Sequence, residues 1–270
     1  MRRPELNVSN GPAFLYNRAM LRRLAISARQ LLLPAHCAAC NAPAPPDGRW
    51  PLCEACGFAM ARLIAAPYCP LCGRHAGPHT AGPDGCLFCR QYPVRFDAAV
   101  RLGPYEGPLK DLILRCKYGR QEFTAQVLGR LLAERLALAP WGDLVDLVVP
   151  VPLHWGRRIS RGFNQALVLA QEVARAVPGA GAKVVQRLRR VRPTPHQSSL
   201  PSGRRHRNVR GAFAVRHAAG VKGRHVLLVD DVMTSGTTVA ECTRVLQGAG
   251  ARAVYVAVAA TADYDEPGRW

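Results

Sequence analysis

The spacing of hydrophobic positions changes several times along the chain, and these changes predict alternating strands and helices. Continuous apolar runs predict buried strands, and apolar positions three and four residues apart predict amphipathic helices. The predicted strands are residues 96–102, 146–152, 184–185, 213–215, 225–229 and 253–259, and the predicted helices are residues 109–117, 123–138, 163–177 and 237–249. Such alternation indicates an α/β fold with a mainly parallel sheet flanked by helices.

Polar stretches follow several of the predicted strands. In parallel sheets, ligands bind beyond the carboxyl ends of the strands. Residues 150–158, the segment 183–210 and residues 230–238 all begin near such ends. We therefore expect a ligand site where these three stretches converge.

The run HVLLVDDVMTSGTT (225–238) ends a hydrophobic strand in two adjacent aspartates, Asp230 and Asp231, and then in small hydroxyl residues. Unpaired amides at a helix start bind anions, and Gly236 lets the backbone approach a ligand closely. Two carboxylates nearby suit the vicinal hydroxyls of a sugar. The run therefore predicts a ribose 5-phosphate site. The alternative is a helix capped by hydroxyls, with two solvated aspartates.

Eight of the ten cysteines form four Cys-x-x-Cys pairs. Two such turns complete the tetrahedral shell of one zinc ion, so the pattern predicts two structural zinc sites. No secretion signal is predicted, which disfavours a disulfide framework. Sequential pairing is the simplest assignment, although a cross-braced one also fits. Gly57 and Gly73 each follow a cysteine, where metal-binding turns often need positive φ. Cys116 and Cys242 fall outside the pattern and are expected to be ordinary thiols. The predicted ligands are Cys37, Cys40, Cys53, Cys56, Cys69, Cys72, Cys86 and Cys89.

The charge balance favours anionic partners. The chain has 37 Lys+Arg against 18 Asp+Glu, a net charge of +19, which suits nucleic acid, phosphorylated small molecules or anionic lipid. GC-rich codon usage would produce the same excess, because only four of the basic residues are lysine. The segment 183–210 holds nine Lys/Arg and no acid, with several prolines. It predicts a basic loop that closes over a phosphorylated ligand or simply remains solvated.

The organisation of the chain follows from these patterns. Residues 1–35 predict a basic extension, residues 36–92 a double zinc-ribbon module and residues 93–270 the α/β domain. Residues 13–33 are compatible with a basic amphipathic helix at DNA or a membrane surface, with a flexible leader, or with a helix packed on the next module. No long uncharged apolar run predicts a transmembrane segment, and a cytoplasmic protein is expected.

The run 225–238 resembles the phosphoribosyl pyrophosphate (PRPP) motif of type I phosphoribosyltransferases. The wider pattern resembles the ComF family of ComFC- and GntX-like proteins. It is carried by the four Cys-x-x-Cys pairs, YEGPL (105–109), KYG (117–119), VPVPL (149–153), RGFNQ (161–165), Gln197, Arg205 and RNVRGAF (207–213). The resemblance covers nearly everything from residue 37 to residue 259.

The resemblance implies a role for each matching residue. The two aspartates would hold the ribose hydroxyls, and the 5-phosphate would be held by Thr234, Ser235, Gly236, Thr237 and Thr238. Pyrophosphate would lie at the strand-end loop with Pro152, Arg157 and Arg158, on the side organised by Arg161 and Asn164. The loop with Gln197 and Arg205 would close over PRPP. Zinc is implied in the cysteine module and magnesium with PRPP.

The resemblance also implies a function. The reaction would displace magnesium-bound pyrophosphate from the anomeric carbon, with Asp230, Asp231 and Arg205 as catalytic residues. The family association implies natural competence, that is, handling of single-stranded DNA during transformation. No segment identifies an acceptor, so catalysis stays open. One alternative is a non-enzymatic zinc-ribbon adaptor that binds single-stranded DNA or another competence protein. Another is a phosphoribosyltransferase of nucleotide salvage or biosynthesis.

Overall fold

The computed structural model describes residues 36–45, 51–77, 80–82, 84–119, 121–153, 159–177, 182–192 and 208–262. The chain divides into two compact units, residues 1–57 and residues 58–270. The first unit carries the first four of the predicted ligand cysteines, and helix α2 (Glu54–Ala65) starts in it and ends in the second. The predicted N-terminal extension, residues 1–35, lies outside the described residues.

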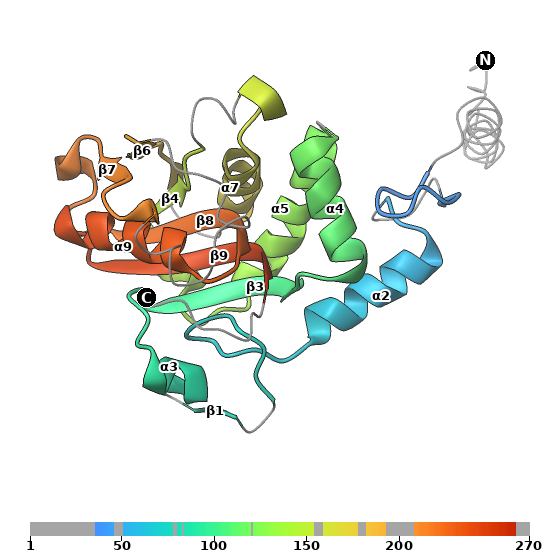
Figure 1. The fold of residues 1–270 in the computed structure, drawn as a ribbon, viewed down its shortest axis with the longest axis horizontal. Helices are drawn as coiled ribbons and strands as arrows, with labels where there is room; N and C mark the ends of the chain where they lie inside the picture. Colours follow the sequence, from blue (N-terminus) through green and yellow to red (C-terminus); the bar gives the residue numbers. More distant parts are fainter. Residues whose placement is uncertain are drawn as a thin grey trace, which may run out of the picture. The chain divides into compact units, whose positions relative to one another are not determined.

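The second unit is built on a five-stranded sheet of order β3-β9-β8-β4-β5 (Figure 1). All neighbouring pairs are parallel, as the sequence predicts. The strands are β3 (Ala98–Pro104), β4 (Leu147–Pro150), β5 (Lys183–Val184), β8 (His225–Met233) and β9 (Ala253–Thr261). Strand β8 runs beyond its predicted end at Val229, because Asp230, Val232 and Met233 still pair with β9. The two aspartates therefore lie inside the strand.

Helices cover both faces of this sheet (Figure 1). Helices α4 (Gly107–Tyr118), α5 (Glu122–Leu136) and α7 (Gln165–Ala176) pack on one face. Helix α9 (Thr237–Gly248) and the antiparallel ribbon of β6 (Leu188–Arg190) and β7 (Phe213–Val215) pack on the other. Within the described residues, every helix is too short or too polar to span a bilayer.

The side chains of β8 point alternately to the two faces of the sheet. Val226 and Leu228 join the apolar cluster that includes Leu246 of α9. Successive strand residues point to opposite faces, so Leu227 and Val229 face the side of α4, α5 and α7. All four side chains of this stretch of β8 are fully buried.

The turn between Cys69 and Cys72 packs on the edge strand β3 of the same unit. The backbone N–H of Ala99 donates to the carbonyl of Pro70 at 2.8 Å. Gly73 adopts φ +74°, as predicted, and a Cβ there would lie 3.3 Å from Met233. The cysteine turn thus takes up part of the open edge of the sheet. The expectation of positive φ at Gly57 is wrong, because Gly57 lies within α2.

Smaller elements complete the described chain. They are β1 (Ala81–Gly82), β2 (Gly85–Cys86), α3 (Leu87–Gln91), and the single-turn 3-10 helices η1 (Gly142–Leu144) and η3 (Ala218–Gly220). Strands β1 and β2 form an antiparallel pair beside the last two cysteines of the motif.

Candidate functional site

Two neighbouring strands end side by side at the predicted site. Pro150 of β4 pairs with Val229 of β8, and the N–H of Val151 donates to the Val229 carbonyl at 2.9 Å. The loop after β4 therefore starts next to Asp230. This proximity brings together two of the three stretches that the sequence predicts to converge.

The adjacent aspartates face different neighbours. Because successive strand residues alternate, Asp231 has the direction of Val229 and Asp230 that of Leu228. The carboxylate of Asp231 pairs with the ammonium of Lys117, from α4, at 3.1 Å. The carboxylate of Asp230 accepts the backbone N–H of Asp231 at 2.8 Å. Each carboxylate is thus placed by its own partner, one through α4 and one through the strand.

The electrostatics of this pair are unusual. Burial, followed by repulsion from Asp231, raises the pKa of Asp230 to about 7. Lys117 and Arg190 oppose this rise in the pKa of Asp230 but do not cancel it. The Asp230 carboxyl is therefore close to half-ionised at neutral pH, and a ligand that donates hydrogen bonds would favour its ionised form.

A tight loop connects β8 to α9. Gly236, the residue before the helix, has φ +74°, a conformation that side chains disfavour. Ser235 and Thr237 are each only 1% exposed, and their hydroxyl oxygens lie 3.2 Å apart. The first turn of α9 follows directly, and its N–H groups have no acceptor within the helix, so the loop has the form of an anion site.

The side predicted for pyrophosphate is described in part. The amide of Asn164, which precedes α7, donates to the carbonyl of Val151 at 3.2 Å. Asn164 and Pro152 line one cavity of about 260 Å³. The guanidinium of Arg161 donates a hydrogen bond to the side-chain oxygen of Gln165 at 3.3 Å, and Gln165 is the first residue of α7. Arg157, Arg158, Gln197 and Arg205 lie outside the described residues, so their predicted roles stay predictions.

The eight predicted ligand cysteines form two separate clusters. Cys37, Cys40, Cys53 and Cys56 make the first, and Cys69, Cys72, Cys86 and Cys89 the second. Within each cluster all four sulfur atoms lie within 4.8 Å of one another. The sequential assignment is confirmed, and all eight thiols are free.

The sulfur spacing suits tetrahedral zinc. Zn–S bonds of about 2.3 Å place neighbouring sulfurs about 3.8 Å apart. In the second cluster the Cys69–Cys89 and Cys72–Cys86 distances are 3.8 and 3.7 Å. In the first, Cys40 and Cys53 are 3.6 Å apart. The donor sets therefore fit two closed four-thiolate zinc sites, which hold structure and leave no open position for chemistry.

The two remaining cysteines are buried, as expected. Burial, with a smaller contribution from Asp231, raises the pKa of Cys116 to about 12. Burial also raises the pKa of Cys242 well above its ordinary value. Both thiols stay neutral and unreactive near neutral pH.

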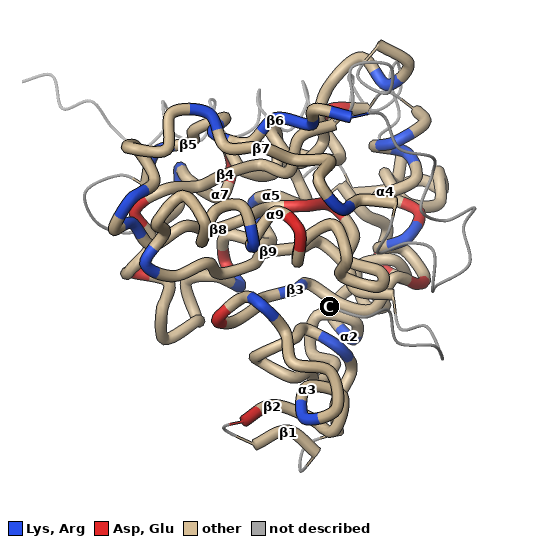
Figure 2. The backbone as a smooth tube through the Cα atoms, turned by 60° about the vertical axis from the view of Figure 1, so that its left-hand side comes forward, with Lys and Arg blue, Asp and Glu red and all other residues tan. Residues whose placement is uncertain are grey.

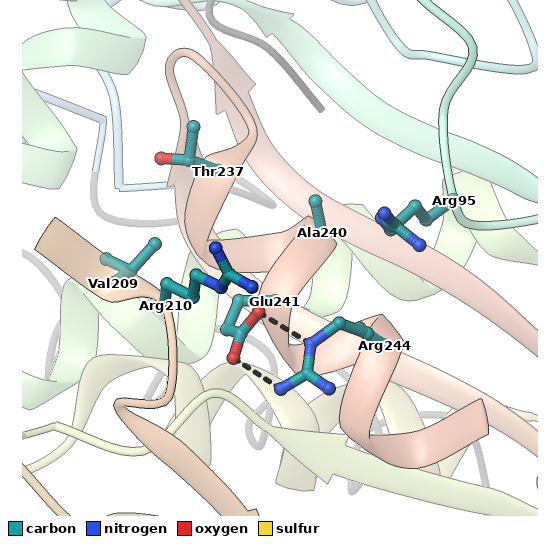
Figure 3. Close-up of a pocket in the computed structure, with 7 residues that line it drawn as sticks. All are labelled: Arg95, Val209, Arg210, Thr237, Ala240, Glu241 and Arg244. Atoms are coloured by element: carbon teal, nitrogen blue, oxygen red, sulfur yellow. Dashed lines mark hydrogen bonds and ion pairs between the residues drawn. The ribbon is translucent and has the colours of Figure 1, made fainter. Parts of the chain in front are cut away.

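Lys and Arg recur along most of the described backbone (Figure 2). Three arginines line a second cavity. Its volume is about 280 Å³, and it is lined by Arg95, Arg210 and Arg244, with Glu241 among them (Figure 3). Arg244 donates to both Glu241 oxygens at 2.7 and 2.9 Å, and Gly211 N–H donates at 2.8 Å. The single carboxylate is thus fully engaged, and the cavity keeps an excess of positive charge.

Comparison with known proteins agrees with this geometry. Residues 163–268 match the family model of the phosphoribosyl transferase domain. The matched residues include β8, β9 and the strand–loop–helix of the site, so the parallel-sheet domain is of the phosphoribosyltransferase type. A solved glutamine PRPP amidotransferase from B. subtilis, complexed with ADP and GMP, is 25% identical. That match covers 50% of this chain and 25% of the other, with a TM-score of 0.34.

The full-length relatives identify the family. DNA utilization protein YhgH of Salmonella typhi is 35% identical over 229 residues, covering 84% of this chain and 96% of the relative. Competence protein F of Haemophilus influenzae is 31% identical over 209 residues, covering 76% and 88%. The chain belongs to the ComF family, with a double four-cysteine module and a phosphoribosyltransferase-type domain.

Two features of the site were not predicted from the sequence. Lys117 is one of only four lysines and ends an amphipathic helix, but nothing in the sequence links it to Asp231. The cavity between Arg95 and Arg210 joins segments far apart in the chain. The KYG motif and the scarcity of lysine drew attention to Lys117, but neither indicated its partner. The basic segment that ends at Arg210 did not indicate a cavity shared with Arg95.

Proposed function

We propose that this protein binds PRPP, or another ribose 5-phosphate ligand, at the carboxyl edge of its sheet, and serves DNA uptake during natural transformation. The competence role is supported by the names of the relatives, DNA utilization protein and Competence protein F. The ligand is supported by the site. The reaction, if one occurs, would transfer the phosphoribosyl group to an acceptor.

The observation that carries the proposal is the order of groups along one strand–loop–helix. Two carboxylates, Asp230 and Asp231, precede a loop with a left-handed glycine and two buried hydroxyls, and a helix start follows. The helix start and hydroxyls supply donors for a phosphate, and the carboxylates accept hydrogen bonds from a diol. A ribose 5-phosphate carries these two groups at opposite ends.

The described residues suggest how the ligand would be handled. The loop 234–238 would hold the 5-phosphate, and the aspartates would fix the ribose hydroxyls and favour positive charge developing at the anomeric carbon. Asn164 would keep the loop after β4 in place through the Val151 carbonyl. Magnesium would arrive on the phosphate oxygens of PRPP and offset their charge.

The loop conformation gives a direct test. We expect Gly236→Ala to weaken binding of PRPP with magnesium by roughly tenfold, because φ +74° costs about 1–2 kcal/mol for a residue with a Cβ. Isothermal titration calorimetry should show one saturable site in the wild type. Gly248→Ala is the matched control, since no atom lies within 4 Å of a Cβ built there. Equal affinities for the wild type and Gly236→Ala, or no heat from either, would contradict the proposed site.

The arginine-lined cavity favours a second function, binding of single-stranded DNA. Among the described residues, neither Arg95 nor Arg210 has an acidic partner, and the one carboxylate in the cavity is engaged by Arg244. Phosphate groups of a nucleic-acid backbone suit such a cluster because guanidinium groups bind phosphate with paired hydrogen bonds.

We expect the double variant Arg95→Gln/Arg210→Gln to bind single-stranded oligonucleotides more weakly and with less dependence on salt. Loss of two phosphate contacts should reduce the slope of log affinity against log salt by about 1.4. Fluorescence anisotropy over a salt series measures both quantities. Arg62→Gln/Arg175→Gln removes two other exposed arginines and should leave the slope close to that of the wild type. Identical slopes for the two double variants would exclude the cavity as the DNA contact.

A further inference from the structure

The ammonium of Lys117 lies inside the predicted ribose site. Its Nζ is 3.1 Å from the Asp231 carboxylate, and the two side chains are only 15% and 16% exposed. Lys117 stands in the last turn of α4, where the partial negative charge of the helix end favours a cation. This ion pair joins a helix and a strand that are far apart in the sequence.

Contacts with α5 and α7 hold the backbone next to Lys117 in place. The side-chain amide of Gln165, from α7, donates to the carbonyl of Cys116 at 3.3 Å. Cys116 itself is 3% exposed and packs in a small apolar cluster with Ala125 and Val168. The backbone that carries Lys117 is therefore held by α5 and α7, which limits where the ammonium can go.

The acidic groups around Lys117 favour its ionised form. Burial alone would lower the pKa of Lys117, but Asp231, Asp230 and Tyr105 outweigh it and raise that pKa. On the side of α9 and β6, Arg190 acts on Asp230. Within the part of the chain that the structure describes, the thiols of Cys116 and Cys242 also lie near these carboxylates, and Arg161 acts on Cys116.

We propose that Lys117 is a positioning residue of the ribose site: it holds the Asp231 carboxylate in place through their ion pair, and it supplies positive charge to the site before a ligand arrives. This inference rests on the proposed function, since it assigns a role in binding the same ligand. An ammonium has three donors, and one of them serves Asp231. The others remain for an oxygen of the ligand.

The proposal predicts how binding changes without the ammonium. Asp231 would lose its ion-pair partner, and the pKa of Asp230, which Lys117 lowers, would rise further, so fewer molecules would present an ionised Asp230 to the sugar. Affinity for the ligand should fall, and the pH at which binding is half-maximal should rise. A lysine that only stabilises the fold would lower the unfolding temperature and leave that pH unchanged.

The experiment uses ribose 5-phosphate without metal and measures affinity by calorimetry over a range of pH. We expect Lys117→Met to lose roughly tenfold or more in affinity and to shift the half-maximal pH upward by about one unit. Lys117→Arg should recover most of both. Lys110→Met is the matched control, because Lys110 lies on the same helix and is exposed.

The outcomes separate this inference from the proposed function. If ribose 5-phosphate does not bind to the wild type, the proposed function is wrong. Wild-type binding with an unchanged affinity and pH profile in Lys117→Met would overturn the role of Lys117 alone. The double variant Lys117→Met/Asp231→Asn should lose less affinity than the two single losses combined, because both changes remove the same ion pair. If Lys117→Met does not fold, Lys117→Arg decides: this variant keeps the positive charge, so a loss of affinity of roughly tenfold or more in Lys117→Arg, with the half-maximal pH shifted upward, overturns the inference.

Discussion

Asp230→Asn should bind PRPP about 10- to 100-fold more weakly than the wild type, because an ionised carboxylate accepts stronger hydrogen bonds than an amide. The same variant should be more stable above pH 7. Folding raises the pKa of Asp230 to about 7, so the folded state favours the protonated form. The wild type therefore loses stability as pH rises from about 4 through 7. Asparagine cannot ionise and avoids this loss, which amounts to at most roughly 4 kcal/mol.

Calorimetry and thermal unfolding at several pH values test both effects together. In Asp230→Asn the new amide oxygen can still accept the N–H of Asp231, and the Lys117–Asp231 pair stays intact, so weaker binding would not reflect local unfolding. Asp143→Asn, in an exposed turn, should change neither quantity. Wild-type affinity in Asp230→Asn would remove this carboxylate from the ligand site. A stability profile parallel to the wild type would contradict the raised pKa.

Loss of zinc from the second cluster should destabilise the sheet unit by several kcal/mol, since structural zinc contributes about 10–16 kcal/mol in small zinc-binding peptides. Metal analysis should find two zinc ions per chain. A chelator that competes with the cysteine thiolates should remove the two zinc ions in two kinetic phases. Cys40 is exposed in the first cluster, whereas all four cysteines of the second are buried, so the first cluster should release its ion faster.

Single substitutions identify which ion is lost. Cys72→Ser should reduce the zinc content from two to one and lower the unfolding temperature markedly, because Cys72 is fully buried within its cluster. Cys116→Ser makes the same chemical change at a buried thiol outside both clusters, so the zinc content should remain two. A full zinc complement in Cys72→Ser, or single-phase release from the wild type, would overturn this assignment.

Local patterns were enough to predict most of the fold. The apolar runs at 225–229 and 253–259 predicted the central strands, and the helical spacing at 237–249 predicted α9 within one residue of its end. Cysteine spacing predicted the two clusters, because the ligands of a structural metal lie close in sequence. These signals are strong because each element is long, periodic or chemically specific.

What the sequence did not predict depends on distant contacts. Helix α2 begins between Cys53 and Cys56, where the motif suggested only a metal-binding turn. Strand β6 was read as basic loop, since Arg189 and Arg190 follow no apolar period, and it forms only by pairing with β7. The extension of β8 through two carboxylates requires β9 alongside. In each case a partner elsewhere in the chain overrides the local preference.

The cysteine turn on β3 has a consequence for association between molecules. Edge strands offer unpaired backbone groups to other chains, and proteins protect them with charges, bulges or covering loops. Here the carbonyl of Pro70 accepts a hydrogen bond from the backbone N–H of Ala99 on edge strand β3. The strand at the opposite edge, β5, is only two residues long. A metal ion that organises this turn would keep the edge of β3 covered and so prevent it from pairing with a strand of another molecule. Zinc starvation would then threaten solubility as well as folding.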